Sequence, residues 1–165
     1  MDMNAGTKNL SDILALQRDV YKQVLDTERK KTEIMMNGDA QALDNIINSE
    51  QSMIMRINSL EAKRISAQNS LGCGTLTLMQ LVQKMKEEQN GGQAEILSLL
   101  HGELTELLSD IKQVNKLNMG LINAKLEFID EFMAEVGMAR ESTGTYTHSR
   151  NMRDDKDTST MFKRI

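Results

Sequence analysis

Apolar residues recur at steps of three and four along most of the chain, a spacing that places them on one face of an α-helix. The first such stripe begins at Leu10, and it weakens where charged residues occupy positions 28–31. Gly38 and Asp39 then interrupt it. Glycine suits the left-handed residue that follows a helix, and aspartate suits the N-cap of the next one. The pattern predicts a helix over 10–37, with the polar residues before it left outside.

Three further apolar stripes follow, and glycine-containing segments separate them. The break after the first helix is short, so the first two helices should fold back as an antiparallel hairpin. Thr75 follows the next break and is a candidate N-cap for a short third helix. Gly102 and Gly120 lie within the fourth stripe, where either could allow a bend. The predicted helices cover residues 39–71, 75–89 and 93–138.

The composition agrees with a helical fold. The chain contains no proline and no tryptophan, and aromatic residues make up 3% of it. Proline is the strongest helix breaker, and strands draw on aromatic and β-branched residues. We therefore expect an all-α fold: an elongated antiparallel helical bundle or coiled coil over residues 1–139, with three long helices and one short helix.

Residues 140–165 differ in composition from the rest of the chain. Small polar residues come first, and a mixed-charge run follows. Neither buries enough apolar area to offset the entropy of ordering, which predicts a flexible C-terminal tail. An apolar and basic group at 161–165 ends the chain. Such a tail is either an ordinary disordered terminus or a segment that folds on a partner, and the apolar end favours the second interpretation.

Charge and hydropathy exclude several classes of protein. The net charge is −4 with a pI near 5.3, whereas nucleic-acid binders usually carry a basic surface. No apolar run approaches the ~18 residues that a membrane span requires. The N-terminus lacks the form of a signal peptide, and Cys73 has no partner for an internal disulfide. These features predict a soluble protein of a reducing compartment, the cytoplasm, with no membrane insertion and no nucleic-acid partner.

Candidate catalytic chemistry is sparse. His101 lies near Glu103 and Glu106, but a metal site needs three or four converging ligands, and the Glu-x-x-His spacing of di-metal bundles does not occur. Pairing Cys73 with His148 as a nucleophile and base would require the tail to dock. We therefore predict no enzymatic activity, no metal and no cofactor. A metal-dependent helical bundle remains the enzymatic alternative.

Three polar residues occupy positions on the apolar stripes. Glu50 and Glu61 do so in the second helix, and Asn118 does so in the fourth. Polar residues at such positions can fix the register of packed helices at a cost in stability. Alternatively, each faces water at a loosely packed end. The pattern alone leaves both interpretations open.

Two segments resemble flagellar export chaperones of the FlgN type. The first is TERKKTEIMMNGDAQALDNIINSEQSMIMRINSLEAKR at 27–64, a charged helix, a short turn and a closing Leu-Glu-x-x-Arg at 60–64. The second is NKLNMGLINAKLEFI at 115–129, which is similar to the family's Asn-x-x-Asn-x-x-Leu-Ile segment. Tyr146 after a glycine, and the apolar-basic end of the chain, are also similar. Thr147 departs from the glycine that often follows the tyrosine in the family.

The resemblance implies a cytoplasmic type III flagellar secretion chaperone. Such a protein binds terminal helices of hook–filament junction proteins, which are hook-associated proteins, prevents their premature assembly and delivers them to the export apparatus. The resemblance also implies that the end of the last helix and the tail bind the substrate protein, and that Tyr146 contacts the export gate. The implied substrate-binding residues are Leu121, Ile122, Leu126, Ile129, Phe132, Met133, Val136, Met161 and Phe162.

The residues themselves support part of this site. The fourth predicted helix is longer than the others, so its far end should lack an intramolecular partner and expose Ile129, Phe132, Met133 and Val136. Exposed apolar surface usually marks an interaction site, and an amphipathic helix could pack there. The alternative function is a coiled-coil structural adaptor or scaffold that forms a homo-oligomer through its last helix.

Overall fold

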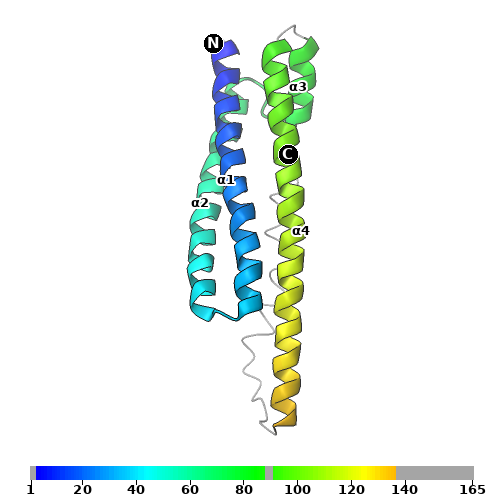
Figure 1. Ribbon diagram of the computed structural model, residues 1–165. Helices are drawn as coiled ribbons and strands as arrows, with labels where there is room; N and C mark the ends of the chain where they lie inside the picture. Colours follow the sequence, from blue (N-terminus) through cyan, green and yellow to red (C-terminus); the bar gives the residue numbers. More distant parts are fainter. Residues whose placement is uncertain (1–2, 88–90, 137–165) are drawn as a thin grey trace. The chain divides into compact units, whose positions relative to one another are not determined.

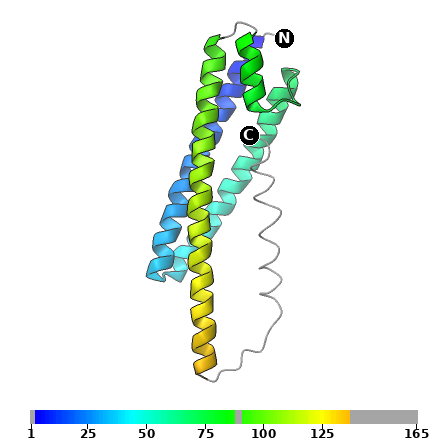
Figure 2. The same ribbon diagram turned by 90° about the vertical axis from the view of Figure 1, so that its right-hand side faces the viewer.

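The computed structural model describes residues 3–87 and 91–136, and this part of the chain forms four helices and no strand (Figure 1). The all-α class with three long helices and one short helix is thereby confirmed. A view turned by 90° shows the last helix as one uninterrupted element, so Gly102 and Gly120 do not break it (Figure 2). The helices are α1 (Met3–Asn37), α2 (Ala40–Ser70), α3 (Leu78–Glu87) and α4 (Gly91–Glu135).

The chain divides into two compact units, residues 1–121 and residues 122–165. The first unit contains α1, α2, α3 and most of α4. The second contains the last turns of α4, and its described part ends at Val136.

Helices α1 and α2 form the predicted antiparallel hairpin (Figure 1). Gly38 adopts φ 75°, the left-handed conformation that glycine tolerates best, and ends α1. The Asp39 side chain then accepts a hydrogen bond from the Ala42 amide at 3.0 Å, which caps α2. Both roles predicted for this turn are confirmed.

Helix α1 begins seven residues earlier than the apolar pattern indicates, at Met3 instead of Leu10. Thr7 is buried, and a Cβ on Gly6 would meet the Leu71 side chain at 2.7 Å. The small residue at position 6 therefore allows α1 to approach the end of α2 closely. Residues that appear polar in the sequence are helical because they pack there, and the prediction that left them outside the helix was wrong.

The segment between α2 and α3 is held by backbone hydrogen bonds. Helix α2 ends in a Schellman motif: the Cys73 amide donates to the Gln68 carbonyl at 3.0 Å, and the Gly72 amide donates to the Asn69 carbonyl at 2.9 Å. Gly72 has φ 68°, as this motif requires. The glycine break predicted after the second helix is confirmed.

The N-cap of α3 is Thr77, and the prediction of Thr75 was wrong. The Thr77 hydroxyl accepts from the Gln80 amide at 3.2 Å, and the Gln80 side chain accepts from the Thr77 amide at 2.8 Å. This reciprocal pair is a capping box, in which each side chain satisfies a backbone amide that has no partner within the helix. Helix α3 therefore begins at Leu78 and not at residue 75.

The core of the first unit consists mainly of leucine and other aliphatic residues on one face of each helix. Full burial of such a side chain contributes about 1.5–3 kcal/mol, so these residues dominate the stability of the unit. Among the described residues, no helix is long and apolar enough to cross a membrane. The largest apolar side chains with less than 2% exposure are Leu10, Leu14, Val20, Leu78, Leu97 and Leu104.

Candidate functional site

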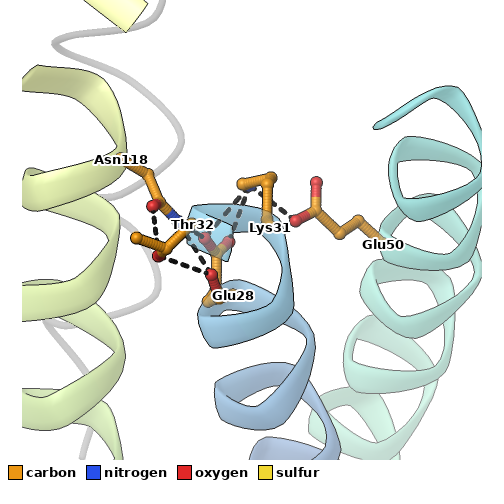
Figure 3. A network of polar contacts seen from close by, with 5 residues as sticks. All are labelled: Glu28, Lys31, Thr32, Glu50 and Asn118. Atoms are coloured by element: carbon orange, nitrogen blue, oxygen red, sulfur yellow. Dashed lines mark hydrogen bonds and ion pairs between the residues drawn. The ribbon is translucent and has the colours of Figure 1, made fainter. Parts of the chain in front are cut away.

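A polar cluster joins three helices of the first unit (Figure 3). Asn118 of α4 is only 1% exposed, and its amide group donates to the Glu28 carboxylate at 2.8 Å and to the Glu28 carbonyl at 3.0 Å. The Thr32 hydroxyl donates to the Asn118 side-chain oxygen at 2.6 Å. We call these residues, together with Lys31 and Glu50, the Asn118 cluster.

Lys31 connects this cluster to α2. Its ammonium group lies 3.0 Å from the Glu28 carboxylate and 2.6 Å from the Glu50 carboxylate, so one cation bridges two acids (Figure 3). Burial raises the pKa of the Glu50 carboxyl, and hydrogen bonding to Lys31 opposes that change. No buried side-chain nitrogen or oxygen of this cluster lacks a hydrogen-bond partner, so the cluster avoids the free-energy cost of burying an unpaired polar group. It also determines which residues of α1, α2 and α4 face one another.

A second polar cluster lies along the hairpin, where Arg64 is buried on α2. Its guanidinium donates two hydrogen bonds to the Glu61 carboxylate, at 2.8 and 2.6 Å, and a third to the side-chain oxygen of Gln68. Gln17 of α1 donates to the same carboxylate at 3.2 Å. Burial raises the pKa of the nearby Tyr21 phenol to about 12, and the charge of Glu61 adds to this shift. We call Gln17, Glu61, Arg64 and Gln68 the Arg64 cluster.

These clusters resolve the two interpretations of the polar residues on the stripes. Glu61 pairs within α2 and contacts α1, and Glu50 pairs with α1. Asn118 is buried against α1. All three therefore specify how the helices pair, and none simply faces water. The motif residues on which the family resemblance rests are largely structural.

The second unit presents a different surface. Seven apolar residues, six on the last turns of α4 and Val136 directly after its end, lie within about 160° of the helix circumference, taking 100° per residue. Phe128 is 69% exposed, Phe132 54% and Ile129 49%. We call this surface the α4 stripe; it comprises Ile122, Leu126, Phe128, Ile129, Phe132, Met133 and Val136.

Most residues of the site predicted from the sequence belong to this stripe. Ile129, Phe132 and Val136 are exposed as predicted, whereas Met133, which was also predicted to be exposed, is half-buried. Leu121 is half-buried and ends the first unit. Phe128 is the most exposed apolar residue of the stripe and was missing from the predicted set. Its spacing of four residues from Phe132 was the signal that could have identified it.

Three residues of the predicted site lie outside the described residues. These are the tail residues Met161 and Phe162 and the gate residue Tyr146. The tail domain assigned to 140–165 lies outside them as well. Their proposed roles therefore rest on the family resemblance.

The described residues contain no group of three or more histidine, cysteine, aspartate or glutamate side chains placed to hold a metal ion. Cys73 is buried, and its sulfur accepts a hydrogen bond from Lys84 at 3.7 Å. The carboxylate of Glu103 pairs with Arg18 of α1 at 3.2 Å and so links α4 to α1.

The chain is similar to known proteins of one family. A family model described as FlgN protein matches residues 1–154. The uncharacterized protein YvyG of Bacillus subtilis (strain 168) is 30% identical over 112 residues, which cover 67% of this chain and 68% of that protein. No solved structure matches the chain significantly. The chain therefore belongs to the FlgN family, a family of flagellar export chaperones.

Proposed function

We propose that this protein is a cytoplasmic chaperone of flagellar type III secretion. It binds terminal helices of hook–filament junction proteins, keeps them from assembling early and delivers them to the export gate. The α4 stripe and the tail residues Met161 and Phe162 bind the substrate, and Tyr146 contacts the gate.

The exposed aromatic and aliphatic residues of the α4 stripe carry this proposal. Three large side chains, Phe128, Ile129 and Phe132, are each about half exposed or more on one face of a helix. Contiguous exposed apolar surface is costly in water and usually marks an interaction site. An amphipathic helix fits it, because helix-in-groove recognition uses anchors at this spacing.

Substitution of Phe132 by Asp tests the stripe. A charge at the centre of the apolar contact must be desolvated on binding, so we expect Phe132→Asp to weaken binding by about a hundredfold, as loss of a hot-spot residue does. The measurement is isothermal titration of the purified chain with a peptide that spans the C-terminal helix of a hook–filament junction protein.

Leu99→Asp is the matched control. Leu99 also lies on α4 and is 66% exposed, but it belongs to the first unit. Its substitution should leave the affinity within about twofold, as for a surface change away from the site. Equal affinity for the Phe132→Asp variant and the unchanged protein would remove the stripe from the binding site.

The structural adaptor is the competing function, and it shares the same surface. If the α4 stripes of two copies pack against each other, light scattering should show an oligomer for the unchanged protein and a monomer for the Phe132→Asp variant. A monomer that binds the peptide supports the chaperone, because its stripe is then available to a partner.

A further inference from the structure

Carboxylates border the α4 stripe. Between residues 122 and 136 the sequence places four carboxylates, Glu127, Asp130, Glu131 and Glu135, and one lysine, Lys125. At 100° per residue, Lys125 falls within the arc of the stripe, and Glu127 falls on the opposite side of the helix. All five charged side chains are exposed. At 100° per residue, Glu135 lies about 20° beyond the edge of the stripe formed by Phe128, and Glu131 lies one turn before it.

These acids also oppose the helix dipole. Helix α4 ends at Glu135, and its last turn contains no basic residue. The C-terminal end of a helix carries partial negative charge, so carboxylates there are unfavourable and cations are favourable. This end of α4 is therefore negative from both the backbone and the side chains, beside an exposed apolar face.

A cationic partner would relieve this repulsion, and a second copy of the same stripe packed in parallel would increase it. Two copies packed in parallel through their stripes would bring their Glu131 and Glu135 carboxylates to the same part of the interface, which disfavours this self-pairing. Lysine or arginine beside the apolar face of a partner helix would instead meet Glu131 and Glu135 across the interface, as flanking charges do in helix pairs.

We propose that the segment bound by the α4 stripe is an amphipathic helix with lysine or arginine on the flank that meets Glu131 and Glu135. The proposal rests on the proposed function, because it specifies the chemistry of the chaperone's substrate helix. The apolar residues supply affinity, and the acidic edge selects among apolar helices by charge.

Two designed peptides test the selection. They share one set of leucine and isoleucine positions and differ only in their flanking positions, which are lysine in one peptide and glutamate in the other. Fluorescence anisotropy with the full chain should give about fivefold tighter binding of the lysine peptide at low ionic strength. High salt should reduce this preference, because salt screens exposed charges.

Glu135→Lys and Glu127→Lys form a matched pair for this test. Both replace an exposed glutamate on the same helix, but Glu127 lies about 180° from the centre of the stripe. Glu135→Lys should remove at least half of the preference for the lysine peptide, whereas Glu127→Lys should preserve it. Equal affinity of the unchanged protein for both peptides, or equal loss in both variants, would overturn the proposal.

The outcomes separate this proposal from the proposed function. If both peptides bind equally and Phe132→Asp abolishes binding, the stripe binds helices but does not select by charge. If neither peptide binds, both ideas fail. If a chain that ends after residue 139 binds both peptides more tightly and by the same factor, the chain's own tail occupies the stripe. If the unchanged protein is an oligomer and the Phe132→Asp variant is not, a second copy of the chain occupies the stripe. Either result would contradict the proposal that the stripe binds a basic helix of another protein.

Discussion

The amide of Asn118 uses both of its ends. Its nitrogen donates to Glu28, and its oxygen accepts from Thr32. Asparagine has this double capacity, and neither leucine nor aspartate could replace it in this environment. A buried polar contact of this kind adds little net stability when satisfied, but it penalises every other register in which it would be unpaired. Asn118 therefore acts as a register determinant of α4 on α1.

Asn118→Ala should destabilise the protein by about 1–3 kcal/mol, because the buried Glu28 carboxylate loses a donor and a small cavity forms. Urea unfolding followed by circular dichroism measures this change. Asn123→Ala is the matched control, since Asn123 is exposed on the same helix, and it should change stability by less than about 0.5 kcal/mol. Equal effects of the two substitutions would show that the cluster contributes nothing specific.

At the scale of elements, helix ends are fixed by local chemistry that the sequence displays only in part. Helix α3 has ten residues and is too short to be stable alone, so its cap matters more than it would in a long helix. Both Thr75 and Thr77 precede its apolar residues. Only Thr77 has a glutamine three residues later, and this glutamine completes the capping box.

Thr77→Ala should lower the stability of α3 by about 1 kcal/mol, because it removes the acceptor for the Gln80 amide. Amide hydrogen exchange in α3 should accelerate before global unfolding is affected, since local opening is the cheaper route. Thr75→Ala is the control and should leave exchange in α3 unchanged. If exchange in α3 were faster only in the Thr75→Ala variant, the N-cap of α3 would be Thr75 and not Thr77.

At the scale of the whole molecule, the buried contacts and the exposed apolar stripe belong to different units. Residues 1–121 contain the two polar clusters and the buried core, and residues 122–136 present the apolar stripe. Burying the stripe residues in the first unit would remove the surface that the proposed function requires. The polar clusters therefore stabilise the first unit, and the described residues of the second unit carry the exposed apolar surface that the proposed function uses.

A chain that ends after residue 139 tests the contribution of the tail. It keeps the whole α4 stripe and lacks Tyr146, Met161 and Phe162. If the tail binds the substrate together with the stripe, the affinity for the junction-protein peptide should fall by about tenfold, the loss expected for one or two apolar anchors. Titration calorimetry measures the affinity, and the thermal unfolding midpoint should stay unchanged. Unchanged affinity would confine the substrate site to α4.

Several features followed from the sequence alone because they depend on neighbouring residues. The helical period predicted all four helices, and Gly38 with Asp39 predicted the turn between α1 and α2. The exposure of Ile129, Phe132 and Val136 was also predicted, from the length of the last stripe. Local periodicity and turn chemistry act over a few residues, so the linear sequence displays them directly.

Other features required the tertiary structure. The sequence could not show that Asn118 meets Glu28 and Thr32, because these residues lie 90 and 86 positions away. It left residues before Leu10 outside α1, because their burial depends on the close approach of Leu71 to Gly6. Periodicity determines which face of a helix is apolar, but only the packed arrangement decides which part of that face is buried and which remains open to a partner.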